Sequence, residues 1–457
     1  MVTSPDCRDV LIIGAGPVGL AMAVALQERG IESIQVIEQT RAFRRVGQGV
    51  DLLPNGLQAL RKASPQVRDT LVEAFFKSPL GASMSTGKCQ WIRRNLAGEI
   101  RRTVNLNFDD WVDRFGEGRI SVSWFDLQST LRAAIDPSKI WINCRCTEIT
   151  QENNQVLAQC QGSSFVPDNP YAHWDESAPS GDKPSSVPGL QVSITGETIA
   201  AKLIIAADGI NSTVRQQVFQ ETPFMDYASP DYSGWAAIGA PRPFPVPPAI
   251  VDSLSQGYFH DQAIVTLSTE TLPEDSSLEA SPRIVLVKRE GNQIFFLLHF
   301  PWPLENNSSP DTLALIKSGL DALAAADFPE SVLQVVRAAD PEHCISRLYY
   351  QHPVQTESGS SPWSQDRIVL VGDAAHGMPP FIAQGTNQGF EDVAQLAPAI
   401  AQLINQGQLD NPDAVQAVFN QYEQVRKPRM AQVQKATLES DDWDQNQWDT
   451  FTEWLYA

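Results

Sequence analysis

The fold is decided by residues 10–19, which read Val-Leu-Ile-Ile-Gly-Ala-Gly-Pro-Val-Gly. The apolar run Val10 to Ile13 is typical of a strand that is buried on both faces. A helical pattern follows from Val18 to about Arg29, and Gly30 stands where such a helix would stop. Ser33 to Glu38 predicts a second strand, so the first forty residues form one β-α-β unit.

The three glycines between this strand and helix have the spacing of a dinucleotide-binding loop. Gly14 permits a tight turn, Gly16 lets the backbone approach a pyrophosphate, and Gly19 lets the helix pack closely on the sheet. Glu38 ends the second strand, where a carboxylate accepts hydrogen bonds from an adenosine ribose and repels the 2′-phosphate of NADP. The loop by itself leaves NAD and FAD open. The residues expected at the nucleotide are Gly14, Ala15, Gly16, Pro17, Val18, Gly19, Glu38 and Gln39.

The composition narrows the possible functions. A length of 457 residues predicts two or three structural units. The net charge of −20 argues against nucleic acid or an anionic membrane as a partner. The six cysteines form no Cys-x-x-Cys pair, which excludes a zinc ribbon and a redox-active dithiol, and we expect no metal site. No apolar run reaches the ~18–20 residues that span a bilayer, so we expect a cytoplasmic protein without a transmembrane segment.

Two later stretches bring polar residues to the ends of buried strands. Asp208 and Gly209 follow the apolar run 203–207, and Gly372 and Asp373 follow the run 367–371. Because ligands of open α/β sheets bind outside the carboxyl ends of the strands, both pairs are candidates for the nucleotide site. An Asx turn at Asp208 and a helix N-cap at Asp373 are the structural alternatives.

A stiff loop and a long helical pattern follow Asp373. Residues 377–380 read Gly-Met-Pro-Pro, and the proline pair that ends at Pro380 could form one wall of a slot for a ring. The helical pattern begins at Gly385, Thr386 and Asn387 and continues to about Ile404. Its positive end would stabilise the negative charge near N1 and O2 of a reduced flavin. These stretches therefore favour FAD over NAD.

In these motifs the sequence resembles the FAD-dependent aromatic hydroxylase superfamily, the para-hydroxybenzoate hydroxylase-like single-component flavoprotein monooxygenases. The glycine loop, Ala207-Asp208-Gly209 and Gly372-Asp373 stand in the family's order, and the resemblance covers the whole chain, most weakly over 220–350. It implies that Glu38 binds the adenosine ribose and that Asp373 binds the ribityl chain or the pyrophosphate. It also implies that the backbone of residues 385–387 holds the flavin pyrimidine, and that Asp208 and Gly209 take part in nicotinamide cofactor use.

The resemblance further implies a mixed α/β fold in which a Rossmann-like FAD-binding domain is interleaved with an antiparallel-sheet substrate domain. The expected segments are 1–75, 119–222 and 351–457 for FAD binding and the C-terminal helices, and 76–118 and 223–350 for the substrate domain. Residues 163–189 are rich in Pro, Ser and Gly and predict an insertion loop or a disordered excursion. Strands are expected at 264–267, 283–289 and 294–300.

Two further features concern the helices. The family usually begins one helix with an Arg that pairs with the pyrophosphate, whereas this chain has Trp124 there. Because an indole cannot neutralise a diphosphate, we expect Arg119, Arg45 or Arg44 to substitute, or FAD to bind less tightly. In the tail, Trp448, Phe451 and Leu455 are spaced i, i+3, i+7 and predict a terminal helix that docks by one aromatic face.

The activity implied by the resemblance is that of an FAD-dependent NAD(P)H monooxygenase. Such an enzyme uses dioxygen to hydroxylate or epoxidise an aromatic or unsaturated apolar small molecule through a flavin C4a-hydroperoxide. NADPH or NADH would bind transiently, which agrees with the single glycine fingerprint. Two alternatives stay open: an FAD-dependent reductase of the geranylgeranyl reductase type, without oxygen insertion, and a non-enzymatic scaffold.

No catalytic side chain is predicted, because the sequence shows no Ser/His/Asp, Cys/His or paired-carboxylate constellation. For His376, inside the Gly372-Asp373 motif, we expect packing or support rather than proton transfer. Four residues could line a substrate pocket, although we expect each to lie in the core or on the surface: Tyr258, His260, His299 and Trp302.

Overall fold

The computed structural model divides the chain into two compact units. Unit 1 comprises Met1–Gly81, Gly116–Asp231 and Tyr350–Leu438, and unit 2 comprises Ala82–Phe115, Tyr232–Tyr349 and Glu439–Ala457. The structure describes residues 7–40, 43, 49–78, 81–82, 89–152, 154–162, 191–192, 196–240, 242–269, 272, 278, 280–303, 311–356 and 359–457. The predicted insertion loop 163–189 lies outside the described residues, as do Arg44 and Arg45.

Unit 1 is built on a sheet whose central strands run parallel. Its strands follow the order β10-β7-β2-β1-β11-β21-β20, and β9 joins β11 to β8. The bounds are β1 Arg8–Ile13, β2 Ile34–Ile37, β7 Ile140–Ile142, β8 Arg145–Glu152, β9 Gln155–Gln161, β10 Gln191–Val192, β11 Glu197–Ala206, β20 Ser364–Gln365 and β21 Ile368–Leu370. Residues Val10 to Ile13 are buried, as expected of a strand covered on both faces. The predicted α/β fold is confirmed.

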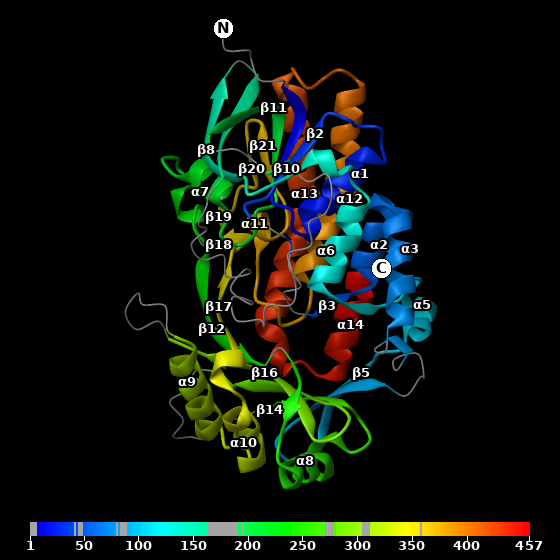
Figure 1. The fold of residues 1–457 in the computed structure, drawn as a ribbon, viewed down its shortest axis with the longest axis vertical. Helices are drawn as coiled ribbons and strands as arrows, with labels where there is room; N and C mark the ends of the chain where they lie inside the picture. The colour runs from blue at the N-terminus through cyan, green and yellow to red at the C-terminus, as the bar shows by residue number, and fades with distance from the viewer. Residues whose placement is uncertain are drawn as a thin grey trace. The chain divides into compact units, whose positions relative to one another are not determined.

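Helices on the unit 1 sheet hold the nucleotide-binding motifs in place. Its helices are α1 Pro17–Gln27, α2 Pro54–Ala63, α3 Pro65–Lys77, α6 Trp124–Ala133, α7 Thr213–Phe219, α11 Asp373–His376, α12 Gly385–Asn405 and α13 Pro412–Glu439, with short turns η1 Pro137–Lys139 and η3 Met225–Tyr227. Helix α12 packs against α1 and α2 (Figure 1). The small pairs β3 Gly49–Leu52 with β6 Ile120–Ser123 and β18 Gln355–Thr356 with β19 Gly359–Ser360 complete this unit.

Unit 2 contains a sheet with the strand order β17-β12-β16-β15-β14-β4-β5, and the short strand β13 also pairs with β16. The bounds are β4 Gln90–Arg94, β5 Ile100–Asn105, β12 Asp231–Gly239, β13 Phe244–Pro245, β14 Ile264–Ser268, β15 Arg283–Lys288, β16 Gln293–Pro301 and β17 Ile345–Gln351. The strands predicted at 264–267, 283–289 and 294–300 are confirmed as β14, β15 and β16. Their alternate residues form one apolar core with the helices of this unit.

Several helices of unit 2 contribute side chains to the apolar core on one face of its sheet. The helices and turns are α5 Phe108–Phe115, α8 Pro248–Leu254, η4 Ser255–Phe259, α9 Thr312–Ala325, α10 Glu330–Ala338, η5 Pro341–His343, η6 Ser440–Asp442 and α14 Gln445–Tyr456. Helices α9 and α10 lie side by side against β16 (Figure 1). No helix in the described part of the chain is long and apolar enough to cross a membrane.

The tail forms the predicted terminal helix, α14. Trp448 and Leu455 are buried on one face, and the guanidinium carbon of Arg102 lies 3.5 Å from the centre of the Trp448 ring. Tyr456 packs edge-on against Phe115 of α5, with ring centres 5.0 Å apart. These contacts lie within unit 2, so the predicted segment 351–457 is divided: residues Glu439–Ala457 belong to unit 2 and not to the unit that carries the glycine loop.

Candidate functional site

Four neighbouring parallel strands bring the predicted motifs to one edge of the unit 1 sheet. Ile13, at the end of β1, pairs in register with Ile37 of β2 and with Ala206 of β11, and Ala206 pairs with Leu370 of β21. The residues that directly follow these four strand ends are the glycine loop, Glu38, Ala207 to Gly209 and Val371 to Asp373. The edge of the sheet therefore collects motifs that are hundreds of residues apart in the sequence.

The glycine loop is shaped by close backbone contacts. Gly14 has a φ of +106°, and an added Cβ there would lie 2.4 Å from the carbonyl oxygen of Ala207. An added Cβ at Gly19 would lie 2.0 Å from the carbonyl oxygen of Gly14. At Gly16 it would meet no atom within 4 Å. Two glycines are thus required by the protein itself, whereas the third faces open space at the amino end of α1.

Glu38 fixes this loop. Its Oε2 accepts a hydrogen bond from the amide of Ala15, and its Oε1 accepts one from the amide of Thr40, each at 2.8 Å. Each carboxylate oxygen keeps a further acceptor position, so Glu38 can still receive a ligand hydroxyl. Gln39, its predicted neighbour at the nucleotide, is exposed.

Helix α6 contacts the loop through a residue that the sequence analysis did not single out. The side-chain amide of the buried Gln128 donates to the carbonyl oxygen of Ala15 over 2.8 Å. Gln128 lies four residues after Trp124, which begins the helix, so the spacing to that position would have been a usable signal. Arg119, one of the three expected substitutes for the missing arginine, is buried and paired with Asp51 at 2.8 Å.

Asp373 is a second carboxylate at this edge of the sheet, and it can accept hydrogen bonds from a ligand. Gly372 precedes it with a φ of +59° and is the N-cap of α11, which begins at Asp373. Within the described residues, the Asp373 carboxylate receives no hydrogen bond, and burial raises its pKa, with a further rise from Asp392 that His376 opposes. An added Cβ at Gly385, at the start of α12, would lie 3.6 Å from its Oδ1. The carboxylate therefore lies beside the amino end of α12, whose first amides have no partner inside the helix.

Asp208 and Asn387 are already engaged by the protein. The Asp208 carboxylate accepts from the hydroxyl of Ser212 at 2.6 Å and from the amide of Val214 at 3.2 Å, which caps α7. Asn387 donates to the carbonyl oxygen of Asp51 at 2.9 Å and accepts from the amide of Leu53 at the same distance. Only the backbone at Gly209 and at Asn387 remains for a ligand. Thr386 is the second residue of α12, whereas Pro380 is exposed in the loop before this helix.

A buried network of charged side chains on α12 and α13 holds the Gly372 loop in position. Oδ2 of Asp392 accepts from the amide of Gly372 at 2.8 Å and from Nε2 of His376 at 2.7 Å, and Oδ1 accepts from Nε of Arg426 at 2.8 Å. Burial alone would raise the pKa of Asp392, but His376 and Arg426 together lower it. Arg426 also binds Glu391 over 2.6 Å. Helices α12 and α13 therefore set the position of the loop that presents Asp373, and His376 has a supporting place in this network.

His352 links two of the loops at this edge, and its burial makes the stability of unit 1 depend on pH. Its amide donates to the carbonyl oxygen of Gly377 at 2.8 Å, and its Nε2 donates to that of Ile210 at 2.8 Å. Burial, followed by the charge of Arg215, lowers the pKa of His352 to about 3.

We expect the His352→Gln variant to lose less stability in acid than the wild type. Between pH 6.5 and 3 the unfolded chain binds a proton at His352 that the folded chain does not, so stability falls as the pH falls. From pH 7 to pH 5 this one group should account for about 2 kcal/mol. Urea unfolding at both pH values measures the difference. The exposed His343, as His343→Gln, serves as the control, and equal pH slopes for wild type and His352→Gln would contradict the assignment.

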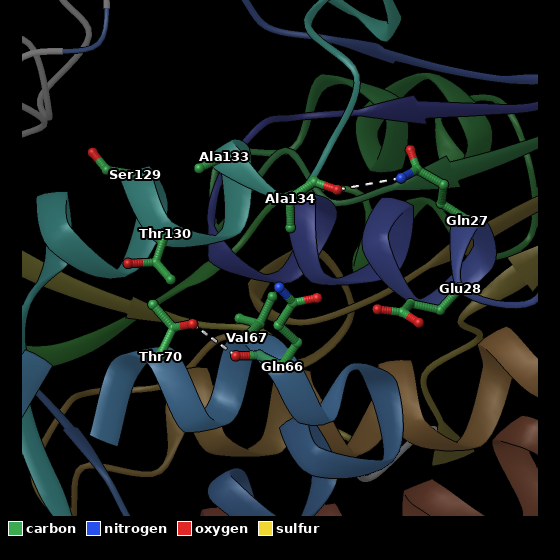
Figure 2. Close-up of a pocket in the computed structure, with 9 residues that line it drawn as sticks. All are labelled: Gln27, Glu28, Gln66, Val67, Thr70, Ser129, Thr130, Ala133 and Ala134. Atoms are coloured by element: carbon green, nitrogen blue, oxygen red, sulfur yellow. Dashed lines mark hydrogen bonds between the residues drawn. The ribbon is translucent and has the colours of Figure 1, made fainter. Parts of the chain in front are cut away.

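A separate pocket lies at the other end of α1, between α1, α3 and α6 (Figure 2). It has a volume of about 740 Å³, and Gln27 at its rim donates to the carbonyl oxygen of Ala134 over 3.3 Å. Its lining residues are Gln27, Glu28, Gln66, Val67, Thr70, Ser129, Thr130, Ala133 and Ala134. This groove contains none of the predicted motif residues and lies at the carboxyl end of α1. Because a helix binds anions at its amino end, the groove does not serve as the nucleotide site.

The four residues that could have lined a substrate pocket lie in unit 2. Tyr258 and His299 are buried, Trp302 is partly buried against the apolar core, and His260 is exposed. The hydroxyl of Tyr258 donates to the carbonyl oxygen of Leu96, and that of Tyr349 lies 3.0 Å from Nδ1 of His299. His299 alone of the four lies on the sheet face opposite the apolar core.

The sheet edge of unit 1 fits FAD by three observations. The amino end of α1 carries no side-chain cap and faces open space at Gly16, which suits a pyrophosphate. Glu38 keeps acceptor positions for a ribose. Asp373 offers a carboxylate that receives no hydrogen bond from the described residues, which suits the hydroxyl groups of a ribityl chain. No side chain that the structure describes fills the space beside Gly16.

Comparisons with known proteins agree with this fit. A family model described as FAD binding domain matches residues 8–68 and 351–437, which contain the glycine loop and the Gly372-Asp373 loop. The chain is 24% identical to 6-hydroxynicotinate 3-monooxygenase of Bordetella bronchiseptica, over 95% of this chain and 94% of that protein. It is also 24% identical to 3-amino-4-hydroxybenzoate 2-monooxygenase of Streptomyces cremeus, over 93% of this chain and 85% of that protein.

A solved structure shows the same fold. The HpxO protein of Klebsiella pneumoniae, complexed with FAD and uric acid, aligns with a TM-score of 0.62 at 20% identity, over 98% of this chain and 92% of that one. The fold, the matched FAD-binding segments and the relatives along the full length agree with the resemblance seen in the motifs. The matched FAD-binding segments and these relatives support the resemblance of the chain to the FAD-dependent, aromatic hydroxylase-like monooxygenases.

Proposed function

We propose that this protein is an FAD- and NAD(P)H-dependent monooxygenase that hydroxylates or epoxidises an aromatic or unsaturated apolar small molecule. The single observation that carries the proposal is the assembly of the glycine loop, Glu38, Asp373 and the amino end of α12 at one sheet edge. The two relatives named above are monooxygenases of hydroxylated aromatic acids by name, which supports an aromatic substrate.

Each residue at this edge has a role toward FAD in the proposal. The amides at the start of α1 bind the pyrophosphate, and Glu38 binds the adenosine ribose. Asp373 binds the ribityl chain or the pyrophosphate. The backbone of residues 385–387 holds the pyrimidine, where the positive end of α12 stabilises negative charge. The nicotinamide cofactor binds transiently near Gly209, and Asp208 supports that loop through its cap of α7.

When bound, FAD supplies the redox chemistry that passes electrons from NAD(P)H to dioxygen and delivers one oxygen atom to the substrate. The chain contributes binding, orientation and the exclusion of water. The unit 2 sheet binds the substrate in this proposal, and its residues decide which compounds are accepted. No side chain has to transfer a proton in the oxygenation, which agrees with the absence of a triad from the sequence.

Replacing Asp373 by Asn should weaken FAD binding and leave the fold intact. The substitution keeps the shape of the side chain and removes a charged acceptor that has no donor in the described part of the chain, so the loss should appear in the bound state alone. A hydrogen bond to a charged group corresponds to roughly a ten- to hundredfold change in affinity. Fluorescence titration of the apoprotein with FAD measures it. A melting temperature that falls while the affinity stays the same would show that Asp373 is structural.

The proposal is tested by reconstituting the protein with FAD and following flavin reduction by NADH and NADPH in the presence of phenols and isoprenoids. We expect a yellow protein whose flavin is reduced faster when a substrate is present. A protein that remains colourless after reconstitution would overturn the proposal. Reduction without oxygen transfer would favour the reductase alternative.

A further inference from the structure

Helices α2 and α12 of unit 1 meet at their amino ends, where one buried side-chain amide joins them. Oε1 of Gln384, the N-cap residue of α12, accepts hydrogen bonds from Nδ2 of Asn55 on α2 and from Nε2 of Gln388, each at 2.9 Å. Gln384 is 1% exposed and Asn55 is 5% exposed. Neither N-cap residue makes a side-chain cap, so the positive ends of both helices lie beside this amide.

The orientation of the Gln384 amide is fixed by two charged side chains. Arg426 can only donate, so the atom of Gln388 that lies 2.7 Å from its Nη2 must be the oxygen Oε1. Nε2 of Gln388 therefore faces Gln384, which must present its oxygen in return. The carboxylate of Glu391 orients Asn55 in the same way, because it accepts from Nδ2 of Asn55 at 2.6 Å. Both routes give the Gln384 amide the same orientation.

This orientation has a cost at the amino end of α12. Within the described residues, the buried Nε2 of Gln384 has no hydrogen-bond partner. The preceding residue, Ala383, has a φ of +55°, a left-handed conformation that is unfavourable for alanine. Asn387 holds this conformation by donating to the carbonyl oxygen of Ala383 at 2.7 Å. An unpaired buried donor and a strained backbone both lower the stability of the protein, so their joint presence here favours a functional reason for the arrangement.

We propose that Gln384 is a positioning residue, which holds the amino ends of α2 and α12 together and thereby raises the reduction potential of bound FAD. The inference rests on the proposed function, in which the backbone of residues 385–387 holds the flavin pyrimidine. Reduction adds negative charge to this ring, and the first amides of α12 stabilise that charge only while they point toward it. Without the side chain of Gln384 the strained turn at Ala383 relaxes, and these amides lose their direction.

The test is a redox titration of the FAD-loaded Gln384→Met variant beside the wild type. The preference of the protein for reduced over oxidised FAD should weaken about tenfold, which lowers the midpoint potential of this two-electron couple by about 30 mV. The stability of the apoprotein in urea should stay the same or rise. The unpaired donor is removed, and both Asn55 and Gln388 keep the Glu391 carboxylate as an acceptor.

A second variant and a control separate positioning from folding. Asn55→Ala removes the same link from the side of α2 and should also lower the potential. Gln35→Met removes another buried amide of unit 1, which donates to the carbonyl oxygen of Lys139 at 2.8 Å, and should lower stability without moving the potential. An unchanged or higher potential in Gln384→Met, or an equal fall in Gln35→Met, would overturn the inference. The titration requires no turnover, so a lowered potential in a protein that transfers no oxygen would count against the proposed function alone.

Discussion

The Gly16→Ala variant is expected to fold normally and to purify without FAD. The backbone at Gly16 is extended, with a φ of −70°, and an added Cβ meets no protein atom within 4 Å. Any penalty must therefore come from a ligand that approaches this backbone. Because the second glycine of the loop is the one that allows the pyrophosphate close, we expect FAD affinity to fall about a hundredfold or more.

Titration of the apoprotein with FAD measures this loss, and the melting temperature of the apoprotein shows whether the fold is affected. Gly257→Ala is the matched control, because an added Cβ there also meets nothing within 4 Å and the residue belongs to unit 2. Its FAD affinity should equal that of the wild type. Retention of full affinity in Gly16→Ala would place the pyrophosphate elsewhere.

The Asp392→Ala variant is expected to show the largest loss of stability. Asp392 and His376 are fully buried and Arg426 is 2% exposed, so removing the carboxylate deprives three buried donors of this acceptor: Nε of Arg426, Nε2 of His376 and the Gly372 amide. Breaking a buried ion pair from one side costs about 3–5 kcal/mol. The free energy of unfolding in urea should fall by this amount, and FAD affinity should fall with it, because the Gly372 loop loses its anchor.

The exposed pair of Lys77 and Glu73 provides the comparison. Its side chains are 73% and 67% exposed, and exposed pairs contribute at most about 1 kcal/mol, so Glu73→Ala should change stability little. If Asp392→Ala and Glu73→Ala were equally stable, the buried network would not be what holds the loop.

The fold was predictable where a short stretch determines its own conformation. Residues 10–38 combine a buried strand, a glycine turn and a helix with Pro17 in its first turn, and each choice agrees with the next. The strands β14, β15 and β16 of unit 2 could also be predicted, because their short apolar stretches are bounded by turn residues nearby in the sequence. The unit to which the tail belongs could not be predicted, because the aromatic face of its helix could pack on either unit and the sequence does not show which one.

The loops of the candidate site could be predicted from the sequence, but the side chains that hold these loops in position could not. Gly14, Glu38 and Asp373 each directly follow a predicted buried strand. Because the carboxyl ends of neighbouring parallel strands lie at one edge of the sheet, these residues could be predicted to lie close together. Asp392, Arg426 and Gln128 escaped notice, since a charged or amide residue on a helix looks like a surface residue until the partners from other helices are known.

Mass spectrometry of the product formed under heavy-isotope dioxygen tests the proposed monooxygenase activity most directly. A compound from the panel that accelerates flavin reduction is incubated with the FAD-loaded protein, NADH or NADPH, and labelled dioxygen. We expect a product that carries one labelled oxygen atom, formed in step with the oxidation of the nicotinamide cofactor. A product that gains hydrogen and no label, or an unchanged compound beside released peroxide, would contradict the assignment.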